Sequence, residues 1–457
     1  MWDMHCRKAL ARVVPIALAG LSALPGAARA DDASRIDDLE KKLERSLKAI
    51  EELSAEIREL KAKQSAAPSP AAAPAGSAGT AAQSAQQAAQ IQQLKEQVDQ
   101  LTTSLAAPPS LDLGVPLHGF ADVDFRTNHS GDHGFSIGSL DFYLTPQFGD
   151  RVKALAELIF EVGQNDNPPA VGPDLERLQI GYTFSDDFTL WAGRFHTPYG
   201  YWNTAFHHGK QLQTTIDRPR FLDFEDKGGI LPAHSVGLWG SGGLKAGDGK
   251  VTYDLYIANG PRITGTTGTG TDASGTLDPN LFKDDNHSYE IGANLGYQFG
   301  GVLEGLKLGT HVLNAKVNDD FVPDNNMPSN KTDLRLYGGY GVYVTDDWEI
   351  LSEYYRFNDH DLSGSTGSHN SWAGYAQAGH PFGAYTPYYR FERTRFDQND
   401  NYFAFQQTGV SYRRSVVGLR YDVNPKVALK VEFQNTRTTD RDSFTSNEWR
   451  AQLAVRF

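Results

Sequence analysis

The sequence predicts an all-β transmembrane barrel of sixteen antiparallel strands, preceded by an α-helical coiled coil. Three observations support this fold class. Past residue 111, apolar and polar residues alternate with a period of two over segments long enough for a tilted strand to cross a bilayer. Short links rich in turn residues alternate with long links. Beyond residue 30, no run holds the roughly eighteen apolar residues that a membrane-spanning helix needs.

The composition excludes several other classes of protein. Among 457 residues there are 45 Gly, 24 Phe, 20 Tyr and 7 Trp but only one Cys, and the mean hydropathy is −0.47. A helical membrane protein, a disulfide scaffold and a thiolate metal site do not fit these values. The net charge of −13 disfavours nucleic acid as a partner. Strands that are apolar on one face only would produce this low hydropathy.

Residues 1–30 are expected to be a secretory signal peptide. Basic residues come first, a short apolar run follows, and Ala28-Arg29-Ala30 has the small residues of a cleavage site. A short N-terminal membrane anchor is the alternative, and the brevity of the apolar run disfavours it. Cleavage would remove Cys6 and leave a mature chain without cysteine.

Residues 31–107 predict a helical stalk in two parts. Residues 31–64 hold four heptads with apolar residues at most a and d positions, which indicates a coiled coil. An Ala/Pro/Ser linker at 65–82 and a second short coiled-coil helix at 83–107 follow. A single amphipathic helix lying on another surface is the alternative to the first coil.

Residues 112–457 form the predicted barrel. The alternation is clearest in the last strand, where Trp449, Ala451, Leu453, Val455 and Phe457 share one face. A soluble β-sandwich is the alternative, although it would use shorter strands. The predicted strands cover 116–126, 135–148, 151–163, 174–184, 187–195, 234–242, 249–259, 287–300, 305–317, 332–344, 347–357, 369–380, 383–395, 408–423, 425–438 and 447–457. The long links fall at 164–173, 196–233, 260–286, 318–331, 358–368, 396–407 and 439–446.

A resemblance adds to this pattern. The leader, the cysteine-free alternation and the terminal Phe457 together resemble the trimeric porins of Gram-negative outer membranes. The N-terminal coil, Gly193-Arg194-Phe195 and Pro198-Tyr199-Gly200 are most similar to the phosphate-selective porin O/P and DcaP-like branch. The resemblance implies a homotrimer, Phe457 as the signal read by the barrel assembly machinery, and 196–233 as a third outer loop that folds inward. It also implies an anion or phosphate preference.

The alternation places charged side chains on the lumen wall. Acids concentrate in the early strands and bases in the late strands, so opposed walls would set a transverse field that orients dipolar solutes. The alternative is that these residues are only wetted by a wide pore. The predicted lumen residues are Asp122, Asp124, Glu157, Glu161, Arg177, Arg335, Arg390, Glu392, Arg420, Lys430, Glu432, Arg450 and Arg456.

The link 196–233 has the densest chemistry and is the candidate pore constriction loop. Its candidate residues are His196, Tyr201, Trp202, His207, His208, Lys210, Arg218, Arg220, Asp223, Glu225 and Asp226. Asp217 with Arg218 or Arg220, and the acids near Lys227, either pin the loop to the wall or bind solute. Adjacent His207 and His208 would point to opposite sides of an extended chain, so no metal and no cofactor is expected.

These observations predict an outer-membrane porin that passes small hydrophilic solutes or ions by passive diffusion. No Ser-His-acid grouping is found at one rim of the predicted barrel, so no enzyme activity is expected. The acidic balance of the barrel segment conflicts with the continuous ladder of bases that a phosphate pore needs. A channel specific for organic acids or sugars, and a structural anchor with a periplasmic stalk, stay open as alternatives. The expected partners are lipid, lipopolysaccharide and, through the stalk, peptidoglycan or a periplasmic protein.

Overall fold

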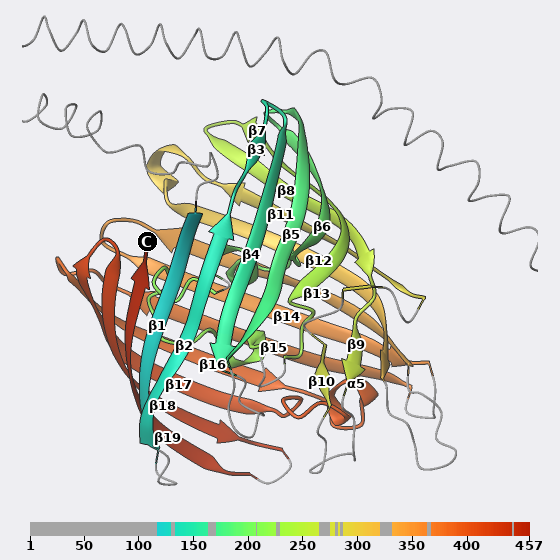
Figure 1. The fold of residues 1–457 in the computed structure, drawn as a ribbon. Coiled ribbons are helices and arrows are strands. Elements are labelled where there is room, and N and C mark those ends of the chain that lie inside the picture. Colours follow the sequence, from blue (N-terminus) through green and yellow to red (C-terminus); the bar gives the residue numbers. More distant parts are fainter. Residues whose placement is uncertain are drawn as a thin grey trace, which may run out of the picture. The chain divides into compact units, whose positions relative to one another are not determined.

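The chain forms a closed antiparallel β-barrel of sixteen strands (Figure 1). The computed structural model describes residues 117–128, 133–162, 171–206, 208–224, 229–264, 275–278, 282–283, 287–319, 331–362, 367–440 and 443–457. They lie in one compact unit, Leu113–Phe457. The predicted signal peptide, both coiled-coil helices and the linker lie outside the described residues. None of the described helices is long and apolar enough to cross a membrane.

Sixteen long strands make the wall. They are β1 (Leu117–Asn128), β2 (His133–Leu144), β4 (Val152–Val162), β5 (Val171–Ser185), β6 (Phe188–His196), β7 (His234–Ala246), β8 (Gly249–Asn259), β11 (Tyr289–Gln298), β12 (Leu306–Asp319), β13 (Lys331–Val344), β14 (Glu349–Asp361), β15 (Ser368–Gly379), β16 (Tyr385–Arg395), β17 (Tyr412–Asn424), β18 (Val427–Thr438) and β19 (Thr445–Arg456). Each pairs antiparallel with its neighbours, and β1 pairs with β19. The predicted sixteen-strand antiparallel barrel is therefore confirmed.

The last residue completes the seam between the first and last strands. The Phe457 N–H donates to Gly119 O at 3.0 Å, and the Gly119 N–H donates to Phe457 O at 3.1 Å. The Phe457 ring also contacts Phe142 of β2, with ring centroids 6.0 Å apart. A side chain at Gly119 would overlap that ring, because a Cβ there would lie 2.3 Å from it. Glycine at 119 thus makes room for the terminal aromatic.

Short elements in the links were not predicted. β9 (Arg262–Thr264) pairs with β10 (Thr276–Leu277) inside the link after β8. β3 (Gln147–Phe148), which pairs with β4, is the separate end of the predicted strand 135–148. α5 (Asn401–Ala404) lies in the predicted long link 396–407. The predicted strand 408–423 corresponds to β17, which begins only at Tyr412. Two 3-10 turns, η1 (Arg220–Leu222) and η3 (Gly301–Leu303), and the short helix α4 (Trp202–Ala205) complete the elements.

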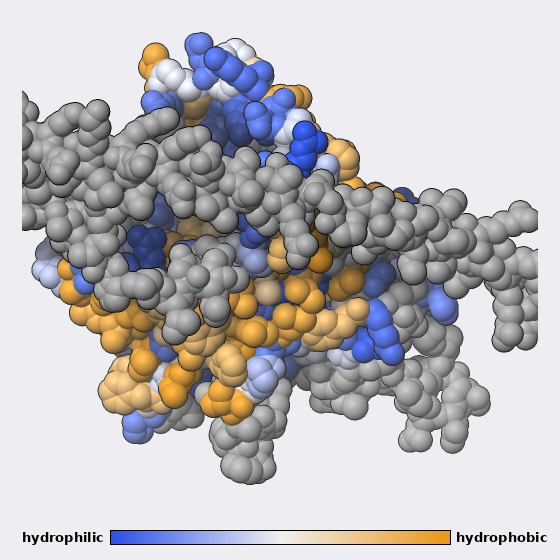
Figure 2. All heavy atoms as spheres, turned by 45° about the horizontal axis from the view of Figure 1, so that its top comes forward, coloured by the Kyte–Doolittle hydropathy of each residue, from blue (hydrophilic) through white to orange (hydrophobic). Residues whose placement is uncertain are grey.

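The two faces of most strands differ as a membrane barrel requires. Outward residues are apolar and exposed, and Figure 2 shows hydrophobic side chains over much of the visible outer face. Examples from around the wall are Val123, Ile137, Ile180, Leu238, Ile257, Leu295, Val312, Tyr354, Val417, Val431 and Leu453. Their sequence neighbours point inward, and most of them are buried. Backbone groups are paired around the closed wall, which permits this apolar surface.

The lumen holds an aromatic core over part of its wall, which the sequence analysis did not foresee. Many inward side chains of β12 to β15 are apolar, and they include Leu313, Leu334, Leu336, Tyr355 and Phe357. The prediction for Arg335 was therefore wrong: Leu334 and Leu336 take the inward positions of β13. Arg335 lies on the opposite face, where its side chain is 61% exposed beside Asp333.

Candidate functional site

The link between β6 and β7 folds into the barrel and fills one side of the lumen. Most of its described side chains are buried, including Tyr199, Trp202 and Ile216 at 1% exposure or less. Gly200 permits the close approach, since it has a φ of +60° and a Cβ there would lie 2.1 Å from Glu353. The sequence thus encodes an inward loop through both its apolar content and this glycine.

Wall carboxylates accept hydrogen bonds from the backbone of the loop. The N–H groups of Tyr201 and Trp202 both donate to Glu353 of β14, at 2.9 Å each. Two further loop N–H groups donate in the same way: Ile216 to Glu432 of β18 at 3.0 Å and Arg220 to Glu392 of β16 at 2.8 Å. Because a buried N–H without a partner is costly, these acids fix the path of the loop.

Wall bases make the complementary contacts with loop carbonyls. Arg390 of β16 donates to Asp217 O at 2.8 Å and to Arg218 O at 3.2 Å. Arg420 of β17 donates to the carbonyl oxygens of Gln211 and Gln213, at 2.7 and 2.9 Å. Lys430 of β18 donates to Lys210 O and Thr215 O, at 2.5 and 2.9 Å. These three late-strand bases therefore hold the loop instead of lining an open pore.

Aromatic packing fills the space behind the loop. Trp202 lies 5.8 Å from Tyr375, and Phe221 lies 5.4 Å from Tyr355, measured between ring centroids. The hydroxyl groups of Tyr355 and Tyr375 donate to Glu353, which ties the aromatic cluster to the loop contacts. This side of the lumen leaves little room for water.

Asp217 is the ionic centre of the loop. It pairs with Arg450 of β19, with Arg414 of β17 at 3.6 Å and with Lys210 of the loop at 3.9 Å. Burial by itself would lower the pKa of Lys210, but Asp217, Asp122 and Asp124 together outweigh burial and raise that pKa. Arg218 instead stacks on Phe224 at 3.8 Å, and Arg220 lies over Tyr412 at 5.1 Å. Asp217 therefore joins the loop to the wall through its ion pairs with Arg414 and Arg450.

A charged cavity of about 210 Å³ lies between the loop and the opposite wall. This volume is large enough to hold several waters. The wall supplies Asp122 and Asp124 of β1, and the Gln452 amide donates to Asp124 at 3.0 Å. Both signs of charge line this space: Asp122, Asp124, Glu161, Asp217 and Asp223 with Arg126, Lys210, Arg218 and Arg450.

Buried histidines and glutamates gather beside this cavity. One potential ligand atom from each of Glu176, His196 and His234 lies within 4.8 Å of the others. His208 Nε2 is 3.4 Å from Glu176 Oε2, whereas His234 Nε2 is only 2.5 Å from it. Two ligands of a tetrahedral zinc ion with bonds of about 2.0–2.1 Å stand about 3.3 Å apart. The residue types could hold a divalent ion, but the His234–Glu176 contact has the length of a hydrogen bond.

The remaining predicted residues divide between the two sides of the loop. Arg177 pairs with Glu157, and His196 Nε2 lies 3.4 Å from Glu157 on the early-strand side. Arg456 is exposed at the end of β19 that carries the short turns. His207, Glu225 and Asp226, with Lys227, lie outside the described residues.

The sequence analysis missed Glu176, Glu349 and Glu353. Glu353 shares its face of β14 with Leu351, Tyr355 and Phe357, so alternation alone would assign that face to lipid. Glu349 accepts from Thr214 of the loop at 2.7 Å. Glu176 sits at a register irregularity between β4 and β5, where strict alternation fails. The one sequence signal that could have identified Glu353 is its position as a single acid inside an apolar run.

Comparisons with known proteins find similarity in structure only. The chain matches no known protein family and no curated protein in sequence. The anion-selective porin from Comamonas acidovorans aligns with a TM-score of 0.48 and 12% identity, over 75% of this chain and 99% of that chain. The outer-membrane channel DcaP of Acinetobacter baumannii aligns with a TM-score of 0.46 and 11% identity, over 75% and 97%. OmpT, an outer membrane protein of Vibrio cholerae, gives 0.47 and 10%, over the same shares. The barrel assignment rests on the strand pairing of the chain itself.

Proposed function

We propose that the protein is an outer-membrane channel through which small hydrophilic solutes and ions diffuse passively. The observation that carries this proposal is the mixed-charge cavity between the inward loop and the wall formed by β1, β2 and β4. An apolar outer face suits a bilayer, and a charged inner space suits water and ions. The chain itself then carries out no chemical reaction.

The charge balance of the cavity favours weak selectivity over a strict phosphate pore. Five acids and four bases line it. Arg390, Arg420 and Lys430, which would supply a ladder of bases, are occupied by loop carbonyls. The anion preference that the resemblance implies would therefore depend on Lys210, Arg218 and Arg450, whose field the neighbouring acids oppose.

Assembly completes the proposal. We further propose that the protein is a homotrimer and that the barrel assembly machinery recognises Phe457. We also propose a periplasmic stalk that contacts peptidoglycan or a periplasmic protein. All three agree with the sequence pattern. The exposed Phe457 ring at the seam, 47% accessible, is available to such machinery.

Planar-bilayer recording of the purified, folded protein tests the channel. We expect discrete current steps and, in a salt gradient, a reversal potential close to zero. Absence of current from folded protein would contradict a channel and leave a plugged structural anchor. Saturable block of the current by an organic acid or a sugar would instead indicate a substrate-specific channel.

A further inference from the structure

The outward face of β16, β17 and β18 changes from apolar to basic near the ends that carry long loops. Along β16, the exposed rings of Tyr389 and Phe391 are followed by Arg393 and Arg395. The same change occurs on the two neighbouring strands. There, Val417 and Leu419 give way to Arg413 on β17, and Leu429 and Val431 give way to Arg437 on β18.

Three of these arginines form a row across the sheet. Arg413 of β17 is the register partner of both Arg393 of β16 and Arg437 of β18. Side chains at directly opposed positions stand about 4.5–5.5 Å apart at Cβ, and like charges there repel. All three side chains are exposed on the outer face of the barrel. Such a row is stable in the presence of an anion that binds several guanidinium groups at once.

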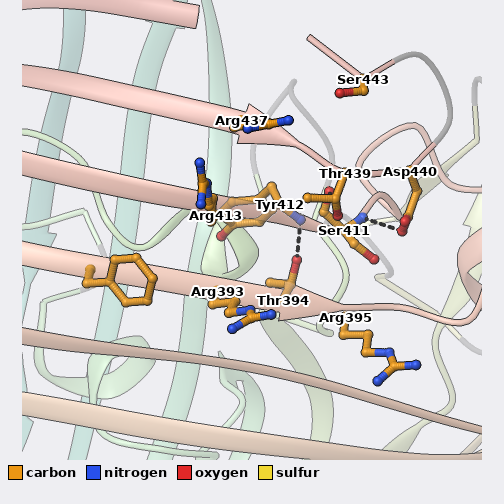
Figure 3. A pocket seen from close by; sticks show the side chains of 11 residues that line it. Arg393, Thr394, Arg395, Ser411, Tyr412, Arg413, Arg437, Thr439, Asp440 and Ser443 are labelled. Atoms are coloured by element: carbon orange, nitrogen blue, oxygen red, sulfur yellow. Dashed lines mark hydrogen bonds between the residues drawn. The ribbon is translucent and has the colours of Figure 1, made fainter. Parts of the chain in front are cut away.

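A cavity of about 570 Å³ lies over this row, within the size range of ligand sites of about 300–1,000 Å³. Figure 3 shows Arg393, Arg395, Arg413 and Arg437 around it, with Asp440 at its edge. Within the described ranges, none of these arginines forms an ion pair with an acid. Asp440, the acid lining the cavity, accepts from the Ser411 N–H at 3.2 Å.

Aromatic and basic neighbours extend the site towards β14. Arg395 is the register partner of Trp372 on β15, which in turn pairs with Arg356 on β14. Arg393 lies over the Trp372 ring at 5.9 Å. Tryptophan at the edge of an apolar band is typical of the membrane–water interface. The arginines therefore stand at headgroup level, directly beyond the surface that contacts acyl chains.

We propose that Arg393, Arg395, Arg413 and Arg437 bind the phosphate groups of lipopolysaccharide. Guanidinium groups bind phosphate oxygens through paired, charge-assisted hydrogen bonds. An amphiphile suits this place better than a soluble anion, because its acyl chains would cover the adjacent apolar band. The inference rests on the proposed function for one point: the long loops must face the outer leaflet, where lipopolysaccharide resides.

The test compares two triple variants of the full chain that lose the same charge. The first is Arg393→Gln, Arg413→Gln, Arg437→Gln; the control is Arg151→Gln, Lys245→Gln, Lys426→Gln, whose residues are exposed at the short-turn end. Native mass spectrometry in detergent measures bound lipid A, with inorganic phosphate and dephosphorylated lipid A as further probes. We expect the first variant to bind lipid A at least about tenfold more weakly, as the loss of several charge-assisted contacts predicts. The control and the wild type should bind alike.

Three results would overturn the lipid site. They are equal lipid A binding by both triple variants, equal binding of dephosphorylated lipid A, and displacement of the lipid by inorganic phosphate. Loss of the oligomer in the first variant with lipid binding intact would assign this face to a subunit contact instead. If the triple variant fails to fold, Arg413→Gln compared with Arg413→Lys provides the same test, because lysine keeps the charge.

Bilayer current separates this inference from the proposed function. The arginines lie outside the lumen, so the triple variant should conduct like the wild type. A wild-type protein that binds lipid A but passes no current would contradict the channel and keep the lipid site.

Discussion

The two sides of the lumen differ in the side chains that line them. Behind the inward loop, β12 to β17 present many aromatic and aliphatic side chains, and the charged groups Glu353, Arg390 and Glu392 among them contact loop backbone. Facing the loop, β1, β2 and β4 present Asp122, Asp124 and Glu161 to a cavity. The difference shows that a charged residue on the inner face is not by itself a pore residue. The hydrogen-bond partner of the residue determines its role. A guanidinium group that binds loop carbonyls is structural, whereas one that faces the cavity can act on ions.

The largest effect is expected from Arg390→Met on the loop-holding side. This change leaves the Glu392 carboxylate, 2.9 Å away, buried without its cation. Loss of one partner of a buried pair costs roughly 3–5 kcal/mol of unfolding free energy. Urea unfolding in lipid vesicles measures it, and single-channel conductance should rise as the loop loosens. Adding Glu392→Gln should recover part of the loss; no recovery would contradict the pairing.

A smaller loss should follow from Glu353→Gln. The amide keeps the shape but weakens the acceptance of two loop N–H groups and two tyrosine hydroxyls, at about 1–3 kcal/mol. The same unfolding assay applies, with increased current noise as a second readout. Glu304→Gln, at an exposed turn, is the matched control and should leave both quantities unchanged. Equal effects of the two changes would show that Glu353 does not hold the loop.

Substitutions of the two neighbouring arginines Arg218 and Arg220 should affect the charge selectivity of the channel differently. Arg218 lines the cavity, whereas Arg220 lies over Tyr412 and its backbone binds Glu392. Arg218→Gln should shift the reversal potential in a salt gradient towards cations, with roughly a twofold change in permeability ratio. Arg220→Gln should shift it little. The reverse order would place the ion path behind the loop.

The smallest effect is expected from Arg335→Gln. Its side chain is exposed on the outer face beside Asp333, and exposed pairs contribute about 0–1 kcal/mol. Neither the reversal potential nor the unfolding free energy should change measurably. A shift in charge selectivity would indicate that the Arg335 side chain lies in the lumen.

The sequence predicted the wall of the barrel well because one-sided burial imposes a period of two on each strand. The predicted strand 249–259 coincides with β8. Prediction failed where both faces are apolar. On β13, Leu334 and Leu336 face the aromatic core while Tyr337 faces outward, so polarity no longer distinguishes the faces and Arg335 was misplaced. The hydrogen-bond partners of the charged residues also could not be predicted from the sequence. Arg390 and Lys430 donate to carbonyl groups that lie more than 170 residues away along the chain.

The most direct test of the central claim is thiol accessibility on the two sides of the loop. In a Cys6→Ser background, Asp124→Cys places a thiol in the cavity, and Ala373→Cys places one behind the loop, where residue 373 is fully buried. The measurement is the current through the folded channel before and after a charged methanethiosulfonate reagent. We expect the reagent to reduce the current of Asp124→Cys and to leave that of Ala373→Cys unchanged. Block of Ala373→Cys, or an unaffected Asp124→Cys current, would contradict conduction through the cavity between the loop and β1.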